Sequence, residues 1–335
     1  MLTPTIPTIF IREVLEGVLH QGFHPAPLLR IASIPPALFD EPMARISAEQ
    51  YAGLIKVIAR QTGDEFLGFL TASAKPGTFA MMCYALIGCD SLEKILRRFI
   101  VFMGLFTDEL RWELTVKGSQ AEFCLDHHDI LDRVFSYVHY GSLFLIHRLS
   151  SWYLGRHIPL KKSAFAFADP GYRREYDFLF PGAHQFVRHR SCITFDARYL
   201  SMLPIRTEEA LEGFLPRAMV HMLTMRVSNE RAGARVRMIM GKSLKEGLPK
   251  FETVAQRLNT TSPTLSRRLR EEGTSFQAIK DEVRRDFAIN QLMKGVLSIE
   301  EIADLIGFSE ASAFHKAFRR WTGVTPGAYR QALTP

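Results

Sequence analysis

The last third of the chain contains one small motif twice, and this duplication constrains the fold more than any other feature. The first copy is VAQRLNTTSPTLSRRLREEGTSF, residues 254–276, and the second is IADLIGFSEASAFHKAFRRWTGVTP, residues 302–326. Each copy begins with a short helical pattern that contains a small Ala. It then passes through a polar turn into a second helix with Arg or Lys near its centre. This is the layout of a helix-turn-helix, whose second helix enters the major groove of DNA.

In the first copy, apolar residues recur at helical spacing on both sides of the turn. The residues predicted to face inward are Phe251, Val254, Ala255, Leu258, Leu265 and Leu269. Asn259 and Thr260 form the predicted turn, and Thr261 is a natural N-cap for the second helix. The residues left on the outside of that second helix are Pro263, Thr264, Arg267, Arg268 and Arg270.

The second copy repeats this pattern with aromatic residues in its interior. Its inward residues are Ile299, Ile302, Ala303, Ile306, Phe314 and Phe318. Gly307 suits the positive φ of a tight turn. The outward residues are Ala311, Ser312, His315, Lys316, Arg319 and Arg320. Trp321 and Tyr329 are expected to wedge the last helix into the core rather than to stack on bases. From Ser309 in the turn to the inward Phe314 is five residues, one more than from Thr261 to the inward Leu265 in the first copy.

The charge of the chain supports a nucleic-acid partner for this segment. Residues 231–335 hold 18 Lys and Arg and 11 Asp and Glu, so they carry a net charge of +7, whereas residues 1–230 are neutral. A basic segment on a neutral protein is typical of phosphate binding, although a solvated basic face is the alternative. Residues 276–294, between the two copies, contain no turn residue and are predicted to form one continuous helix.

The front of the chain mixes helices and strands. At 335 residues and 47% hydrophobic content, the chain is long enough for two domains. Helical spacing occurs at 13–20, 48–62, 91–106 and 130–154, a β-hairpin is predicted over 109–128, and short strands are predicted at 163–168 and 193–195. We therefore expect an α+β N-terminal domain over 1–205, a linker over 206–229 and an all-α domain over 230–335. In the last, helix-turn-helix motifs at 250–272 and 299–321 are joined by a linker helix.

Other classes of site have little support in the sequence. The four cysteines form no CxxC pair, so buried free thiols in a reducing cytoplasm are a better interpretation than a metal site or a disulfide framework. His127, His128, His139 and His147 do not complete a ligand set, so no metal and no cofactor is expected. Neither a signal peptide nor a membrane span is predicted. The sequence contains no catalytic motif that would indicate an enzyme.

The segments RRDFAINQLM, SIEEIADLIGFSEASAFHKAFRRWTGVTPGAYR and SPTLSRRLREEGTSF resemble the DNA-binding domain of the AraC/XylS family of bacterial transcription regulators. That resemblance covers about residues 230–332. The front of the chain, including YALIGCDSLEKILRRF and REYDFLFPGAHQFVRHRSCITFDARYL, resembles the arabinose-binding-like N-terminal effector domain of one AraC subgroup, more loosely, over most of residues 10–205.

The resemblance implies that two recognition helices enter successive major grooves, about 34 Å apart along the DNA. Carried over by position, the base-reading candidates are Pro263, Thr264, Arg267, Ala311, Ser312, His315 and Lys316. The phosphate candidates are Thr261, Ser262, Arg268, Arg270, Arg319 and Arg320. Lys316 departs from the more usual Arg at its position, so weaker discrimination is expected from the second helix.

The expected function is that of a cytoplasmic transcription regulator, an activator controlled by a small-molecule effector, with double-stranded DNA as a partner. The resemblance implies RNA polymerase as a further partner and a homodimer as the assembly. The alternative is an effector-independent activator or architectural protein whose front domain only dimerises. Core packing is the favoured explanation of the aromatic residues of the front domain. The alternative is an effector pocket, for which the candidates are Phe102, Phe106, Tyr137, Tyr140 and Phe144.

Overall fold

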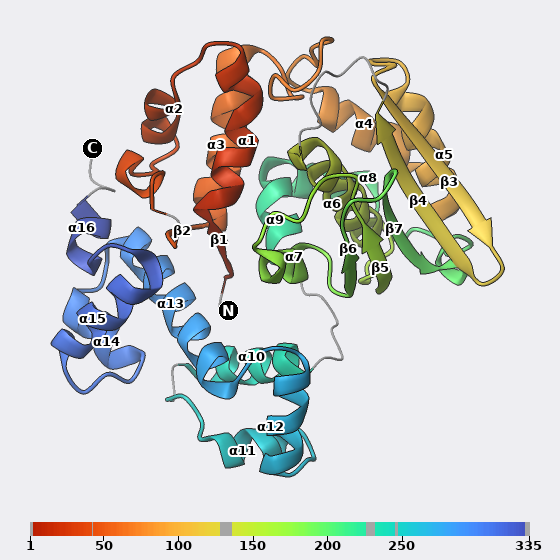
Figure 1. The fold of residues 1–335 in the computed structure, drawn as a ribbon. Coiled ribbons are helices and arrows are strands. Elements are labelled where there is room, and N and C mark those ends of the chain that lie inside the picture. The colour runs from red at the N-terminus through yellow and green to blue at the C-terminus, as the bar shows by residue number, and fades with distance from the viewer. Residues whose placement is uncertain (1–2, 42, 128–135, 226–231, 245–246, 332–335) are drawn as a thin grey trace. The chain divides into compact units, whose positions relative to one another are not determined.

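The computed structural model describes residues 3–41, 43–127, 136–225, 232–244 and 247–331 (Figure 1). Its contacts divide the chain into two compact units. One unit comprises Met1–Ile9, Leu29–Tyr51 and Asn229–Pro335, and the other comprises Phe10–Leu28 and Ala52–Ser228. The chain passes from one unit to the other within α1 (Thr8–His20), α2 (Pro25–Ile31) and α3 (Ala48–Thr62).

The larger unit is built around a five-stranded sheet with the order β3-β4-β7-β5-β6. The strands are β3 (Leu110–Lys117), β4 (Gln120–His127), β5 (Leu160–Ala164), β6 (Ala183–Gln185) and β7 (Ser191–Asp196). Neighbouring strands are antiparallel except β5 and β6, which are parallel. The predicted hairpin is confirmed as β3 and β4, joined through Gly118 at a φ of 58°.

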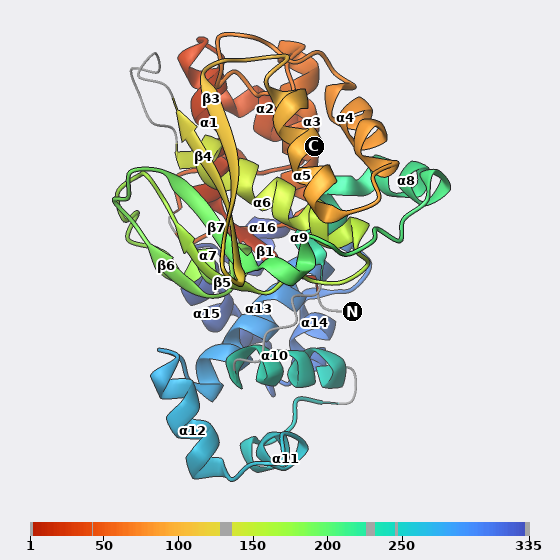
Figure 2. The same ribbon diagram turned by 90° about the vertical axis from the view of Figure 1, so that its right-hand side faces the viewer.

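Six further helices complete this unit: α4 (Thr78–Ile87), α5 (Leu92–Met103), α6 (Ser136–Tyr153), α7 (Arg173–Leu179), α8 (Glu208–Phe214) and α9 (Ala218–Thr224). Two 3-10 turns, Ala197–Tyr199 and Leu215–Arg217, lie among them. Helix α6 contacts the central strands β4 and β7 and is buried along most of its length (Figure 2). Ser91 is the N-cap of α5, because its side chain accepts a hydrogen bond from the Lys94 amide.

Two sequence predictions in this unit need correction or restriction. The strand predicted at 163–168 lies earlier, at Leu160–Ala164, because backbone pairing with β7 decides its position rather than the apolar run. Phe165 and Phe167 follow the strand and pack on Tyr176 instead. The helix predicted over 130–154 is described from Ser136 to Tyr153, and residues 130–135 lie outside the described residues.

The smaller unit is mainly helical. Its C-terminal part consists of α10 (Ala232–Ser243), α11 (Phe251–Arg257), α12 (Ser262–Glu271), α13 (Phe276–Lys294), α14 (Ile299–Leu305), α15 (Ala311–Thr322) and α16 (Pro326–Gln331). From the N-terminal part of the chain it includes the two-stranded sheet β1 (Thr5–Pro7) and β2 (Arg45–Ser47) and the 3-10 turn Pro36–Leu38. The continuous helix predicted over 276–294 is confirmed as α13, between N-cap Ser275 and C-cap Gly295.

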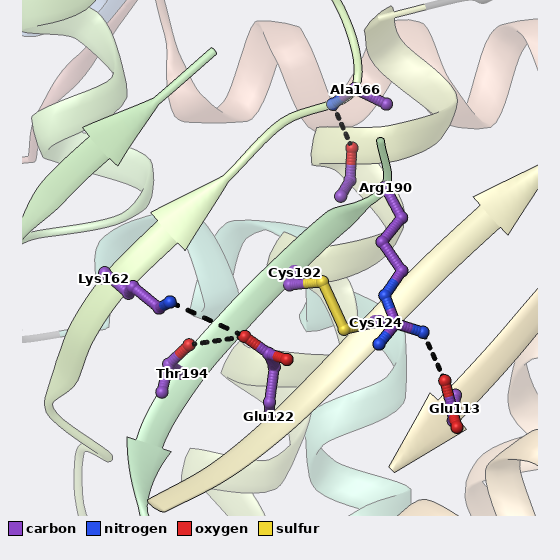
Figure 3. Close-up of a disulfide and its surroundings, with 9 residues drawn as sticks. Glu113, Glu122, Cys124, Lys162, Ala166, Arg190, Cys192 and Thr194 are labelled. Atoms are coloured by element: carbon purple, nitrogen blue, oxygen red, sulfur yellow. Dashed lines mark hydrogen bonds and ion pairs between the residues drawn. A yellow bond between two sulfur atoms is a disulfide. The ribbon is translucent and has the colours of Figure 1, made fainter. Parts of the chain in front are cut away.

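The expectation that all four cysteines are free thiols is wrong for two of them. Cys124 on β4 and Cys192 on β7 are directly opposite in the strand register and form a disulfide (Figure 3). They are 68 residues apart in sequence, so only the pairing of the two strands brings them together. Cys83 and Cys89 are free and buried, as expected.

Reduction of this disulfide should destabilise the sheet. A cross-link that closes a 68-residue loop restricts the unfolded chain, so its loss should lower the free energy of unfolding by about 2–4 kcal/mol. The measurement is thermal unfolding of oxidised protein with and without dithiothreitol. The Cys124→Ser variant serves as the control, because its unfolding should not respond to the reductant. Four reactive thiols in the unreduced, denatured protein would contradict the bond.

Candidate nucleic-acid interface

The first helix-turn-helix consists of α11 and α12. Helix α11 ends at the C-cap Leu258, and Asn259 takes the left-handed conformation that the turn requires, at a φ of 52°. Thr261 caps α12, since its hydroxyl oxygen accepts from the Thr264 amide at 3.4 Å. Leu265 and Leu269 are fully buried beneath α12, and Val254 and Ala255 are buried on α11. The predicted turn, N-cap and inward face are therefore confirmed.

The second helix-turn-helix consists of α14 and α15. Ser298 and Glu301 form a capping box at the start of α14. Gly307 provides the positive φ of the turn, at 76°. Phe314 and Phe318 are fully buried beneath α15, and Tyr329 contacts the Phe318 ring edge-on at 5.8 Å. Trp321 and Tyr329 are both buried, as predicted for residues that hold the last helix in the core.

The caps show how the two recognition helices correspond. Thr261 caps α12 and Glu310 caps α15, and the first inward residue follows four positions later in both helices. The extra residue of the second copy therefore lies in the turn, between C-cap Ile306 and N-cap Glu310. Counted from the caps, Arg267 corresponds to Lys316.

This register adds two positions that the sequence analysis missed. Pro263 and Thr264 correspond to Ser312 and Ala313, rather than to Ala311 and Ser312. Ser266 corresponds to His315. Ala313 and Ser266 are both exposed. Each helix is thus outward-facing at the second, third, fifth and sixth positions after its cap, although Thr264 and His315 are only half-exposed.

Most of the predicted DNA-contacting side chains lie on exposed faces of α12 and α15. The exposed ones are Thr261, Pro263, Arg267, Arg268, Arg270, Ser312, Lys316, Arg319 and Arg320. The half-exposed ones are Ser262, Thr264, Ala311 and His315. The candidates around α12 and those on α15 thus lie on separate helices, and in each helix they lie outside the buried face.

Some of these side chains have intramolecular partners. The Thr261 hydroxyl donates its hydrogen to the Thr264 hydroxyl oxygen at 2.9 Å, so this hydrogen bond is made within the protein. Arg267 Nε lies 3.8 Å from Glu271 Oε1, and Arg320 lies 3.3 Å from Asp281 Oδ2. Both guanidinium groups are about 70% exposed, at 71% and 70%. Such exposed pairs are weak, so DNA phosphates can replace them at little cost.

Helix α13 holds both motifs through helix-end contacts. Glu272, at the end of α12, accepts from the Ala232 and Gly233 amides at 2.7 and 2.9 Å and so caps α10, which packs on α13. Arg284 of α13 donates to the carbonyl oxygens of Ile306 and Gly307 at 2.8 and 3.0 Å. These are the otherwise unpaired carbonyls at the end of α14.

A buried carboxylate on α13 also binds the two-stranded sheet of the same unit. Asp286 Oδ1 accepts from the Thr5 hydroxyl at 2.5 Å, and Arg45 Nε donates to the Thr5 hydroxyl oxygen at 2.9 Å. Asn290, one turn further along α13, donates to the Thr3 carbonyl oxygen at 2.7 Å. The Tyr329 hydroxyl donates to the Arg45 carbonyl oxygen at 3.0 Å. The sequence analysis did not anticipate these contacts, because the partners lie more than 280 residues apart.

The five effector candidates do not form one group. Tyr137 stacks on Phe69 at 5.1 Å and contacts Tyr140 at 5.5 Å. Phe102 and Phe106 contact each other at 5.2 Å, and Phe106 also contacts Phe66. Phe144 lies under the guanidinium group of the buried Arg148. A small cavity between α5, α6 and the sheet is lined mainly by other apolar side chains, such as Leu96, Phe123 and Ile193, and includes none of the five.

The metal interpretation gains no support from the residues that the structure describes. Burial lowers the pKa of His139 to about 4, so this residue is a neutral core histidine, in ring contact with His127. His128 lies outside the described residues. Within the described ranges, the one group with metal-ligand spacing is Glu122, Cys124 and Cys192, and its two sulfur atoms are joined in the disulfide (Figure 3).

Comparison with known proteins identifies the family. Residues 22–203 match the family described as "Arabinose-binding domain of AraC transcription regulator, N-term", and residues 254–332 match a "Helix-turn-helix domain" family. The chain therefore belongs to the AraC family of transcription regulators. It carries an arabinose-binding-like N-terminal domain, and it binds DNA through its helix-turn-helix region. Both the resemblance stated from the sequence and the expected fold class are confirmed.

Individual relatives are also transcription regulators. The Ornithine utilization regulator of Pseudomonas aeruginosa is 24% identical over 328 residues, covering 98% of this chain and 96% of that protein. The HTH-type transcriptional regulator VirS of Mycobacterium tuberculosis is 35% identical over 103 residues, 31% of this chain and 30% of that protein. The crystal structure of the transcriptional regulator CdpR from Pseudomonas aeruginosa is 24% identical and overlaps 75% of this chain and 81% of that chain, with a TM-score of 0.31.

The two sequence relatives are named as regulators, in agreement with the expectation that the chain is not an enzyme. Over the residues that the structure describes, none of the helices is long and apolar enough to cross a membrane.

Loss of the Asp286 carboxylate should destabilise the smaller unit. The Asp286→Ala change leaves the Thr5 hydroxyl and the neighbouring Arg285 guanidinium without this buried acceptor, so the free energy of unfolding should fall by about 2–4 kcal/mol. Urea unfolding of the full chain measures the change. The matched control is Asp304→Ala, on the exposed face of α14, which should change stability by less than about 0.5 kcal/mol. Equal effects of the two substitutions would contradict the role of Asp286.

Proposed function

We propose that the protein regulates transcription by binding a bipartite DNA site, with α12 and α15 in successive major grooves. The observation that carries this proposal is the arrangement of the two motifs on α13. One uninterrupted 19-residue helix separates two helices, α12 and α15, that each present an outward face with basic residues. Half-sites separated by about one turn of DNA, ~34 Å, are expected for such an arrangement.

The two recognition helices contribute unequally in this proposal. Arg267 of α12 reads a guanine, since its planar guanidinium group can donate two hydrogen bonds to one base. Pro263 and Thr264 make the neighbouring base contacts. In α15 the corresponding residues are Lys316, Ser312 and Ala313, with Ala311 and His315 beside them. A Lys lacks the two-pronged geometry of Arg, so α15 contributes more to affinity than to specificity.

The phosphate contacts are made by residues that flank these faces. They are Thr261, Ser262, Arg268 and Arg270 around α12, and Arg319 and Arg320 at the end of α15. Backbone contacts of this kind fix the register of the protein on DNA without reading its sequence.

We further propose that residues 1–205 form an effector and dimerisation domain, and that residues 206–229 link it to the DNA-binding domain at 230–335. In this proposal the protein acts in the cytoplasm as a homodimer. A bound small molecule controls its activation of transcription, which requires contact with RNA polymerase. The arabinose-binding-like match over residues 22–203 supports an effector-binding role. Because the relative from Pseudomonas aeruginosa is named for ornithine utilization, small nitrogen-containing metabolites are the class of effector to test. An effector-independent activator is the second candidate.

Substitution of Arg267 should relax sequence preference. The Arg267→Ala variant should lose about 1–3 kcal/mol of discrimination between the preferred base pair and the others at one position of the half-site that α12 contacts. The corresponding loss for Lys316→Ala should be smaller. Selection of bound DNA from a random pool, followed by titration of single-base variants, measures both. An unchanged base preference in Arg267→Ala would refute the assignment of this residue as a base reader.

Substitution of Arg320 should act on all sequences alike. The Arg320→Ala variant should bind every DNA more weakly and should reduce the slope of log K against log salt by about 1, because one phosphate contact is lost. Fluorescence anisotropy at several salt concentrations tests this. A change confined to one DNA sequence would exclude a phosphate contact. The Lys117→Ala change, at an exposed position of β3 outside both helix-turn-helix motifs, removes one positive charge and serves as a control for charge alone.

Effector control is tested by thermal shift of the full chain against a panel of metabolites, including ornithine and other small amines and amino acids. A ligand that raises the melting temperature and changes DNA affinity supports the regulator under effector control, because a ligand shifts an equilibrium only through its differential affinity. A protein whose melting temperature and DNA binding respond to no member of the panel would favour the effector-independent activator.

A further inference from the structure

The larger unit contains a buried carboxylate that accepts its hydrogen bonds from described residues through hydroxyl groups. Glu13 of α1 is 7% exposed. Its Oε1 accepts hydrogen bonds from the Ser136 hydroxyl at 2.9 Å and the Tyr172 hydroxyl at 2.7 Å, and its Oε2 accepts from the Tyr140 hydroxyl at 2.8 Å. Among the described residues, no Lys or Arg forms an ion pair with it. A carboxylate can accept about four hydrogen bonds, so one position on Oε2 remains.

Two of the residues that donate to this carboxylate, Tyr140 and Tyr172, belong to a cluster of four aromatic rings. Phe10, one turn before Glu13 on α1, contacts the rings of Tyr140, Tyr172 and Tyr176 at 5.4, 6.2 and 6.1 Å. Tyr140 and Tyr176 are 5.6 Å apart, and Tyr172 stacks on Tyr176 at 6.2 Å. The rings come from α1, α6 and the start of α7 (Figure 1). We call Glu13 and these four rings the Glu13 cage.

One polar group of the cage has no partner. Tyr176 is 0% exposed, and its hydroxyl makes no hydrogen bond with any described residue. A buried hydroxyl without a partner costs about 1–3 kcal/mol, so natural proteins retain few of them. Ser136 and Tyr172, by contrast, are half-exposed.

We propose that the Glu13 cage is the binding site for the positively charged end of the effector, an alkylammonium or a similar amine-derived cation. This inference rests on the proposed control by a small molecule. The cation would pair with the Glu13 carboxylate, lie against the faces of Phe10, Tyr140 and Tyr172, and offer an N–H to the unpaired Tyr176 hydroxyl oxygen. Aromatic faces attract cations, and the attraction is strongest where water is excluded.

The chemistry of the cage selects a cation over other ligand heads. An anion would be repelled by the Glu13 carboxylate and would find no basic residue in the cage. A neutral hydroxyl could bond to Glu13 but would gain nothing from the ring faces beyond packing. An ammonium group satisfies the carboxylate, the rings and the Tyr176 oxygen together. Its charge also compensates a carboxylate that is expensive to keep ionised when buried alone.

The titration of Glu13 agrees with this assignment. Burial raises the pKa of the Glu13 carboxyl, although hydrogen bonds from Tyr172, Tyr140 and Ser136 lower it, and the nearby Glu16 raises it further. With a folded pKa above the unfolded value, Glu13 stabilises the fold fully at low pH, and that contribution is lost as the pH rises through the folded pKa. A bound cation would require the ionised form, so its affinity should increase over the same pH range.

The test uses the full chain and three probes of equal length that differ in the charge of the head group: n-pentylamine, 1-pentanol and pentanoate. Calorimetric titration should show millimolar binding of pentylamine to the wild type and no binding of the other two. In the Glu13→Gln variant, which keeps one accepting oxygen for the hydroxyls and replaces the other by an N–H donor, pentylamine should bind about 10- to 100-fold more weakly. The control is Glu212→Gln, an exposed Glu on α8, which should bind as the wild type does.

Folding of the variant is checked independently by its stability. Glu13→Gln should be at least as stable as the wild type at neutral pH, with the advantage disappearing as the pH falls below about 4.5, the ordinary value for Glu. A second variant, Tyr172→Phe, keeps the ring and loses one hydroxyl, so it should retain most of the pentylamine affinity. Loss of binding in Glu13→Gln together with retention in Tyr172→Phe supports a cation held by charge and ring faces.

Other outcomes separate this proposal from effector control in general. Pentylamine binding that survives Glu13→Gln, binding of pentanoate or pentanol instead, or binding of none of the three would overturn the cage as a cation site. A different metabolite that shifts DNA binding equally in wild type and Glu13→Gln would overturn the cage and leave effector control intact. Glu13-dependent binding of pentylamine and larger amines without any change in DNA affinity would support the cage and contradict effector control.

Discussion

Helix α13 is the constraint on which the DNA-binding unit depends. Its buried residues Ile279, Val283, Ile289 and Leu292 support elements on both sides, and Arg284 and Asp286 add polar contacts at defined points. Because a continuous helix is stiff, the orientation of the two recognition helices is set by packing along one rod rather than by a flexible loop. Helix-end capping by Glu272 and Arg284 then fixes α10 and α14 against it.

The same unit includes chain segments from the opposite end of the sequence. The hydrogen bonds from Thr5 to Asp286 and from Tyr329 to Arg45 make the β1–β2 sheet part of the packing around α13 and α16. Helices α1 and α3 begin directly after these strands and continue into the larger unit. Glu13 lies on α1, eight residues after Thr5. A ligand that alters the position of α1 would therefore act on a helix whose first residues adjoin the strand bonded to α13.

Sequence reasoning was most successful where the fold is local. The cap Thr261, the turn at Gly307 and the full extent of α13 depend on residues within one or two turns of each other. It failed where partners are distant. The Cys124–Cys192 disulfide and the position of β5 both depend on pairing with β7, which the spacing of residues along the chain does not reveal.

By itself, the sequence determined two helix-turn-helix motifs, their buried and outward faces, and the excess of positive charge beside them, because helical periodicity and capping are local properties. Only the tertiary structure decided the cap-to-cap correspondence that adds Ser266 and Ala313, the attachment of β1 and β2 to α13, and the Glu13 cage. The strand attachment and the cage depend on groups that packing brings together from separate parts of the chain, whereas the cap correspondence depends on the length of the turn in each motif. In the buried interior, a hydrogen bond to a single carboxylate or hydroxyl contributes more free energy than it would in solvent, and leaving that group unpaired costs more.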